Sequence, residues 1–204
     1  TKAYPQEQKY FTAPFTVYYH LLLDYCDAEM YDKALECIDA DNALGSQIAV
    51  ITRDYDDWLD TPIRMFLITS EHIEDKTVYQ EYFNACNSYI TATQSYCDAH
   101  DYESMRLNFL RQEARNIRDS QGIQAAEPLL MDYIQQAKAH AAKWPTASNY
   151  NRLAYGYTAL YEGYKGNTVK DKAIRFLQEA LEVLDLAIQQ WPDSLNTREL
   201  QATI

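Results

Sequence analysis

Apolar residues recur at helical spacing along most of this 204-residue chain, and this periodicity constrains the fold more than any other feature. The clearest stripe consists of Ala173, Phe176, Leu177, Ala180, Leu181, Leu184, Ala187, Ile188 and Trp191. These positions keep to one face of a helix for about five turns. No stretch alternates with a period of two for long enough to indicate a strand. The sequence therefore predicts an all-α protein.

Capping residues, glycines and prolines divide the periodic stretches into separate helices. Gly45 is predicted to end a helix, and three residues are predicted to cap the helices that follow them: Thr77, Asp101 and Thr168. With only 5 Gly and 6 Pro, the composition favours helices over a β fold with many turns. We expect nine helices, and a tenth that begins near 195, over residues 13–29, 31–43, 46–58, 62–74, 77–99, 101–119, 124–143, 147–165 and 170–191.

One ten-residue segment recurs along the chain. Residues 25–34 and 96–105 share five identical positions at an offset of 71, and residues 164–173 follow the second copy at an offset of 68. Both offsets are close to twice 34 residues, which is the period of the tetratricopeptide repeat (TPR).

The residues at these positions resemble the TPR family. The first segment supplies Tyr18, Leu21, Tyr25, Tyr31, Ala34 and Ile38, where that family has aromatic, apolar and small residues. The resemblance is clearest over 15–43, 86–119 and 154–191, whereas 45–76 departs from it and is expected to form an irregular helical hairpin. Glu29 stands where the family usually has a turn glycine. The resemblance implies a single domain over 1–204, in which antiparallel hairpins stack as a right-handed superhelix.

The resemblance also implies a binding surface. In TPR arrays the first helix of each repeat lines a concave groove, and the matching positions here are Tyr19, Leu23, Asp27, Asn87, Ile90, Gln94, Asp98, Tyr155, Thr158 and Glu162. This mixture of aromatic, amide and acidic side chains implies recognition of a protein or peptide, in an extended or helical conformation.

The overall charge limits the choice of partner. The net charge is −12 and the isoelectric point is about 4.7, so phosphate backbones and anionic lipids are repelled. We therefore expect no nucleic acid partner. No apolar run is long enough to predict insertion into a membrane. The 18 tyrosines suit helix packing and also suit a binding surface.

One acidic cluster permits a catalytic hypothesis. Asp56, Asp57 and Asp60 spell a DDxxD pattern that looks like the metal motif of isoprenoid synthases, and on a helix they would share a face that binds Mg²⁺. The alternative is an acidic, solvated helix end. The four cysteines and four histidines have no zinc-site spacing, and no motif assembles a nucleophile with a base. We expect no cofactor.

Three functional hypotheses follow. The first is a non-catalytic, protein- or peptide-binding scaffold or sensor module of a larger bacterial regulatory, signalling or assembly protein. The second is a structural module that binds a small molecule or a glycan on its tyrosine-rich face. The third is a magnesium-dependent enzyme that uses the aspartate cluster. The chain starts without Met and ends within a helical pattern, so we expect an excised segment, and the sequence does not decide between cytoplasm and bacterial periplasm.

Overall fold

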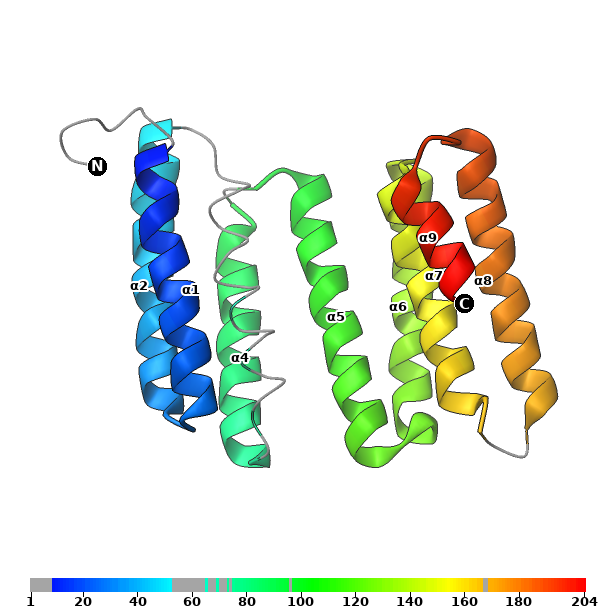
Figure 1. The fold of residues 1–204 in the computed structure, drawn as a ribbon, viewed down its shortest axis with the longest axis horizontal. Helices are drawn as coiled ribbons and strands as arrows, with labels where there is room; N and C mark the ends of the chain where they lie inside the picture. The colour runs from blue at the N-terminus through cyan, green and yellow to red at the C-terminus, as the bar shows by residue number, and fades with distance from the viewer. Residues whose placement is uncertain are drawn as a thin grey trace. The chain divides into compact units, whose positions relative to one another are not determined.

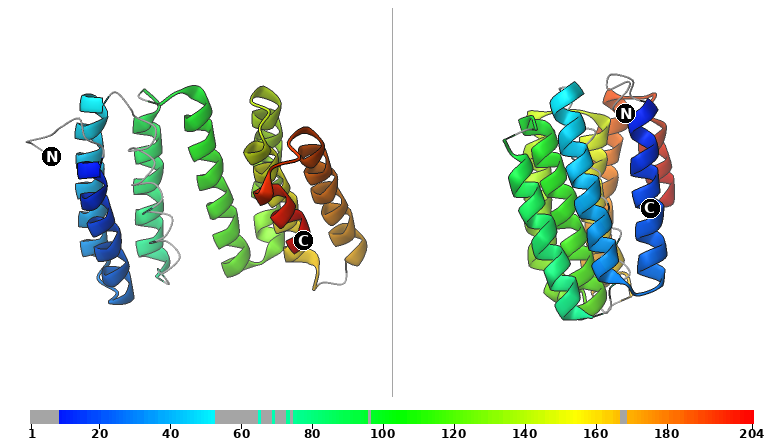
Figure 2. Two further views of the ribbon diagram at one scale, coloured as in Figure 1. Left: turned by 45° about the horizontal axis from the view of Figure 1, so that its top comes forward. Right: turned by 90° about the vertical axis from the view of Figure 1, so that its left-hand side faces the viewer.

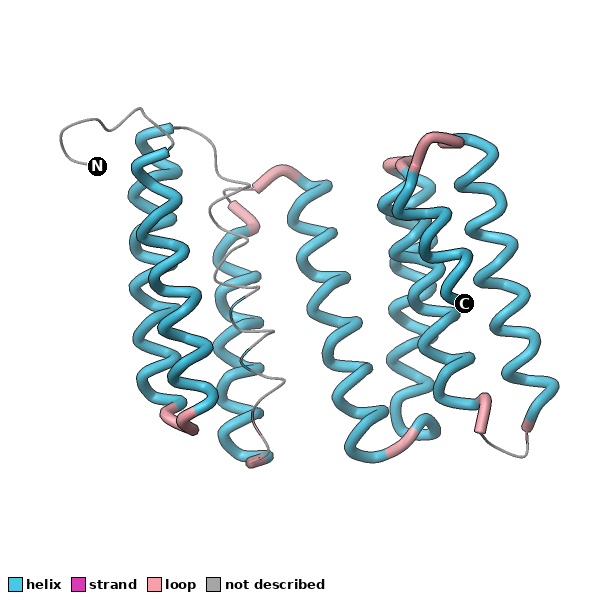
Figure 3. Tube along the Cα trace, viewed as in Figure 1, coloured by secondary structure: helices cyan, strands magenta, loops and turns pink. Residues whose placement is uncertain are grey.

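The computed structural model describes residues 9–52, 65, 69, 73, 75–95, 97–166 and 169–204. All regular structure in this part of the chain is α-helical, without any strand (Figure 3). The predicted all-α class is therefore confirmed. The described helices are α1 (Lys9–Asp27), α2 (Tyr31–Thr52), α4 (Lys76–Thr93), α5 (Ala99–Gln121), α6 (Ile123–Lys143), α7 (Ala147–Tyr164), α8 (Lys170–Gln190) and α9 (Leu195–Thr203).

The chain divides into two compact units, Thr1–Met105 and Arg106–Ile204. The division falls inside α5, whose first turns belong to the first unit and whose remainder belongs to the second. The predicted repeat over 86–119 therefore crosses the division. The predicted repeats over 15–43 and 154–191 each lie within one unit.

In the first unit, α1 and α2 form an antiparallel hairpin (Figures 1 and 2). The turn between them is closed by two backbone hydrogen bonds. The Met30 N–H donates to the Tyr25 oxygen at 2.8 Å, and the Glu29 N–H donates to the Cys26 oxygen at 3.0 Å. Glu29 has a φ of 57°. This pairing and the left-handed residue make a Schellman motif, which usually has glycine at this place.

In the first unit, side chains of α4 contact α2. Tyr82 on α4 is buried, and its hydroxyl donates to the backbone oxygen of Tyr31 at the start of α2. The two rings meet edge to face, with centroids 6.4 Å apart. Two turns further along α4, the Tyr89 hydroxyl donates to Asp39 at 2.5 Å. Tyr82 and Tyr89 therefore join α4 to α2 through hydrogen bonds of their hydroxyls, and Tyr82 also through a ring contact.

The buried face of α1 differs by one residue from the prediction. The repeat pattern places Leu21 inside, but Leu21 is exposed and Leu22 is fully buried. On α2, the predicted inward residues Ala34 and Ile38 are both fully buried. Because successive helical residues are about 100° apart, an error of one residue turns the predicted face well away from the core.

The predicted end of a helix at Gly45 is wrong. The helix α2 continues through Gly45 to Thr52, so no separate helix begins at 46. Glycine in a helix interior costs only about 1 kcal/mol relative to alanine, and Gly45 is buried within the packed face of the helix. The remainder of the predicted hairpin, 53–64 and most of 65–74, lies outside the described residues.

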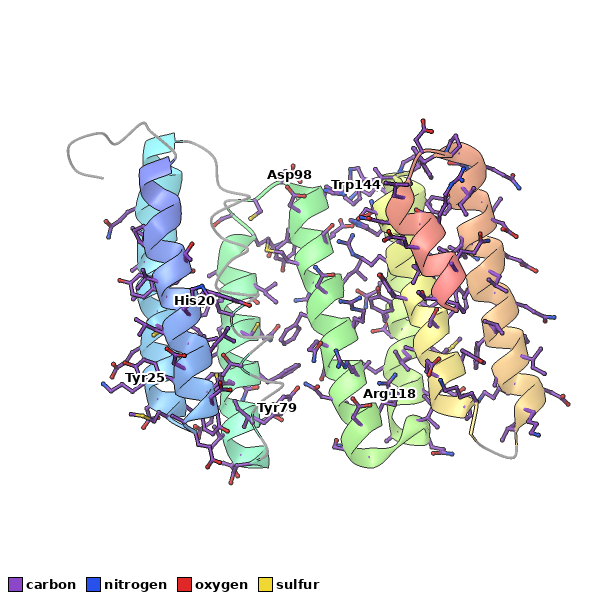
Figure 4. All side chains as sticks on the ribbon, viewed as in Figure 1. His20, Tyr25, Tyr79, Asp98, Arg118 and Trp144 are labelled. Carbon is purple, nitrogen blue, oxygen red and sulfur yellow. The ribbon has the colours of Figure 1, made fainter. Side chains whose placement is uncertain are left out.

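Two predicted caps are also wrong, because an aspartate lies just upstream of each helix. The Asp75 carboxylate accepts the Thr77 N–H at 2.8 Å and caps α4, so Thr77 is already helical. Asp98, labelled in Figure 4, accepts the Asp101 N–H at 3.0 Å before the first turn of α5. The third predicted cap, Thr168, lies outside the described residues.

The second unit is built around α7, which packs against α6 and α8 (Figure 1). The short α9 packs against α8 and α7. The core between these helices and the second part of α5 includes Leu107, Ala114, Leu130, Tyr133, Ile134, Leu153, Leu160 and Phe176. Five members of the stripe predicted on α8 are buried: Ala173, Phe176, Ala180, Leu184 and Ala187.

Glycines set the approach of α6 to α7. A Cβ atom added at Gly156 would lie 2.6 Å from Ile134 Cγ1 and 2.9 Å from the Tyr133 ring. One added at Gly163, two turns later, would lie 2.4 Å from Ile123 Cδ1. These distances are far shorter than van der Waals contact, so only glycine permits this helix spacing.

Candidate functional site

The second unit contains an open pocket with a volume of about 430 Å³. Its walls come from α5, α7 and α9. The lining side chains are predominantly polar or charged: Asn108, Arg111, Ser148, Asn151, Arg152, Tyr155, Asn196, Glu199, Leu200 and Thr203. A pocket of this size and composition suits a ligand that is held by hydrogen bonds and ion pairs.

Arg111 and Tyr155 face each other across the pocket wall. The Arg111 guanidinium carbon lies 5.2 Å from the centre of the Tyr155 ring, within the range of a cation–π contact. In the described part of the chain, Arg111 has no carboxylate within ion-pair distance. Tyr155 is 40% exposed. The pair therefore presents a cation and an aromatic face to anything that enters the pocket.

Arg152 is held in place by its own helix. Its Nη1 donates to Asn149 Oδ1 at 2.7 Å, and the buried Asn149 side chain in turn donates to the Trp144 backbone oxygen at 2.8 Å. Trp144, labelled in Figure 4, ends α6. The Arg152 backbone oxygen accepts the Tyr133 hydroxyl at 2.7 Å. These bonds orient the guanidinium before any ligand arrives.

Asn151 carries an unsatisfied polar atom beside the pocket. Its side chain is only 9% exposed, and among the described residues no donor reaches its Oδ1. A buried acceptor without a partner costs about 1–3 kcal/mol.

Burial and nearby arginines both affect the pKa of the Tyr133 hydroxyl. Burial raises the pKa of Tyr133 to about 12, while the positive charges of Arg111 and Arg152 act in the opposite direction. Arg111 and Arg152 both line the pocket, so two cations lie in one small region of the second unit.

The charges of the chain are unevenly divided between its units. Residues 1–105 contain 6 Lys and Arg against 19 Asp and Glu, a net charge of −13. Residues 106–204 contain 12 against 11, a net charge of +1. The net charge of −12 thus comes from the first unit, and the pocket lies in the unit that does not repel anions.

Of the ten groove residues predicted from the repeat resemblance, only Tyr155 lines this pocket. Its neighbours on α7 are engaged locally: Thr158 donates to the Ala154 oxygen at 3.0 Å, and Glu162 pairs with Lys165. Neither contact excludes a partner, but neither side chain reaches the pocket.

The remaining predicted residues belong to the first unit. Tyr19, Asp27, Asn87, Gln94 and Asp98 are exposed, and Leu23 is half-buried. Ile90 needs a correction, because its side chain is fully buried and packs in the core instead of lining an open groove.

Sequence reasoning missed the arginines and Asn151. The predicted groove positions lie only on the first helix of each predicted repeat, whereas Arg111 lies on the second helix of its repeat. Arg152 and Asn151 lie on α7 just before the third repeat was predicted to start. The only available signal was the spacing Asn151, Arg152, Tyr155, which places an amide, a cation and an aromatic ring on neighbouring turns.

The metal hypothesis gains no support. Asp56, Asp57 and Asp60 lie outside the described residues. The described part does bring Asp98, His100 and Asp101 within 4.8 Å of one another. His100 Nδ1 lies 2.6 Å from Asp101 Oδ1, and Asp98 caps α5, so these groups have a local structural role.

Comparison of the chain with protein-family models, with curated proteins and with solved structures finds no match. Among the described residues, no helix has the length and apolar character needed to cross a membrane.

Proposed function

We propose that this chain is a non-catalytic helical module that binds a protein or peptide partner, and that the Tyr155 pocket is a principal contact point. The observation that carries the proposal is the combination of two arginines in one open pocket: Arg111, which has no carboxylate within ion-pair distance among the described residues, and Arg152, which Asn149 restrains. Such an arrangement binds, because it offers fixed charges and donors.

The proposal includes a TPR-like architecture, in which hairpins stack as a right-handed superhelix. Two antiparallel hairpins, α1 with α2 and α7 with α8, support it. Further support comes from the buried small residues Ala34 and Ala173 and from the left-handed turn at Glu29. A helical repeat of this kind suits a scaffold or sensor module in a larger bacterial regulatory, signalling or assembly protein.

A second candidate is a site for a small molecule or glycan. The volume of about 430 Å³ favours it, because pockets for such ligands measure about 300–1,000 Å³. The open, predominantly polar lining with a single aromatic ring favours a peptide, since a glycan site would be expected to stack sugars on several aromatic faces.

Selection from a displayed library of random peptides on the immobilised chain tests the proposal. We expect enriched peptides to bind the wild type and the Leu186→Ala variant, and to lose binding with Tyr155→Ala. Leu186 is a suitable control, because it is an exposed apolar residue on α8 outside the pocket lining. Peptides that bind all three proteins equally would show that the binding site lies outside this pocket. Failure to enrich any peptide, together with saturable binding of a sugar or metabolite, would favour the second candidate.

A further inference from the structure

We propose that the pocket recognises a carboxylate on its peptide partner, with Arg111 and Arg152 as the cations that bind it. This inference rests on the proposed function and specifies the chemistry of the ligand. Guanidinium groups match carboxylates because two parallel N–H donors meet two oxygens in one plane. Arg111 has no carboxylate within ion-pair distance among the described residues, so its capacity to form an ion pair is not used within the unit.

Preorganisation makes the second arginine effective. Arg152 is already fixed by Asn149, so little side-chain freedom is lost when a ligand binds. Arg111 is positioned by its cation–π contact with the Tyr155 ring. The ligand therefore meets two cations whose positions are defined.

The charge of the lining selects a singly charged group. Arg111, Arg152 and Glu199 give the pocket a net charge of +1. A carboxylate neutralises that charge. A phosphate carries about −1.5 to −2 at neutral pH and would leave the pocket with a net negative charge, so a carboxylate fits better.

The carboxylate has two sources in a peptide, which are an Asp or Glu side chain and the C-terminus. Each selected peptide is therefore synthesised in four forms: as selected, with its acidic residues changed to Asn or Gln, with its C-terminus amidated, and with phosphoserine in place of the acidic residue. Affinity is measured by fluorescence polarisation at low and high salt. The carboxylate that the pocket recognises is the one whose neutralisation abolishes tight binding.

We expect removal of the carboxylate to weaken binding at least about tenfold. The Arg111→Gln and Arg152→Gln variants should show the same loss with the charged peptide, and little further loss with the neutral one. Arg115→Gln is the matched control, because Arg115 lies one turn further along α5, is exposed and is absent from the pocket lining. It should change affinity less than about twofold.

Melting temperatures establish that each variant is folded. Peptides that bind equally well in their neutral forms would overturn the carboxylate while leaving the peptide-binding proposal intact. Tighter binding of the phosphoserine form would overturn the proposed preference of the pocket for a singly charged group. If no peptide binds the wild-type chain, both proposals fail together.

Discussion

Lys172 on α8 forms an ion pair with Glu127 on α6, with 2.5 Å between Nζ and Oε1. Tyr164 at the end of α7 donates its hydroxyl to the other oxygen of Glu127. The Lys172 ammonium also lies 4.4 Å from the centre of the Tyr164 ring. One residue from each of three successive helices therefore joins a single polar network, which ties together the second unit near the ends of these helices.

This network predicts a pH-dependent contribution to stability. Hydrogen bonds from Lys172 and then from Tyr164 lower the pKa of Glu127 below its usual 4.5. The contribution is therefore present above pH 4.5 and is lost as the pH falls through the lowered value. Because the groups are partly exposed, we expect Glu127→Gln to lower the free energy of unfolding by about 1 kcal/mol at pH 7. Urea denaturation at pH 7 and near pH 3 measures the difference.

Glu162→Gln is the control for this change, because Glu162 pairs with Lys165 on an exposed surface. Its effect should be close to zero at either pH. An equal destabilisation by Glu127→Gln at both pH values would show that lost packing, and not the ionised network, is responsible.

Replacement of Glu29 by glycine should stabilise the first hairpin. Glu29 has a φ of 57° in the turn between α1 and α2, a conformation that costs a residue with a Cβ about 1 kcal/mol. Glycine removes this strain but also gains freedom in the unfolded chain, so the expected net gain is about 0.5–1 kcal/mol. Thermal unfolding measures it. Glu29→Ala keeps the Cβ and should give no such gain, so equal stabilisation by both variants would implicate the lost charge.

Addition of a single methyl group at Gly156 should destabilise the second unit. The new Cβ would lie 2.6 Å from Ile134 and 2.9 Å from Tyr133, so α6 and α7 would have to separate. We expect Gly156→Ala to cost about 1–3 kcal/mol despite the better helix propensity of alanine. At Gly166, nothing lies within 4 Å of an added Cβ. Gly166→Ala should therefore leave the denaturation midpoint almost unchanged, and a similar loss at both sites would argue against close packing at Gly156.

Asp41 on α2 should make the chain less stable as the pH rises. Its carboxyl is fully buried, no donor among the described residues reaches either oxygen, and burial raises its pKa from 3.8 to about 7. The folded state therefore holds the proton more tightly than the unfolded state, so stability is lost between about pH 4 and pH 7. Asp41→Asn cannot ionise. Relative to wild type, it should gain on the order of 4 kcal/mol between pH 4 and pH 8.

The measurement is the difference in unfolding free energy between the two proteins at each pH, which cancels the other titrating groups. A difference that does not change with pH would show that Asp41 is ionised or solvated in the folded chain.

Much of the fold follows from the sequence alone, because long stripes identify helices whatever their partners. The α8 stripe from Ala173 to Ala187 is buried as predicted, and the hairpins at both ends of the chain have the expected short turns. Helix ends were harder to predict. Gly45 is tolerated because tertiary packing outweighs its low propensity, and Asp75 outcompetes Thr77 as a cap through its charged acceptor.

The pocket could not be predicted, because it depends on which helices meet in space. Arg111 and Arg152 are 41 residues apart, and only Arg111 lies within a predicted repeat. The repeat pattern identifies Tyr155 as a groove position. It does not include the positions of Arg111 and Arg152. Similarly, the unsatisfied state of Asn151 exists only after α7 has packed, since the same amide in an unfolded chain would be solvated.

The unequal charge of the two units has a kinetic consequence. An anionic peptide of the kind proposed would be repelled by residues 1–105 and would meet no net repulsion from residues 106–204, the half that holds the pocket. For such a ligand, the long-range charge of the acidic half would act as a filter on the association rate. Since the range of this field shrinks to about 8 Å at physiological ionic strength, the filter strengthens as salt is diluted.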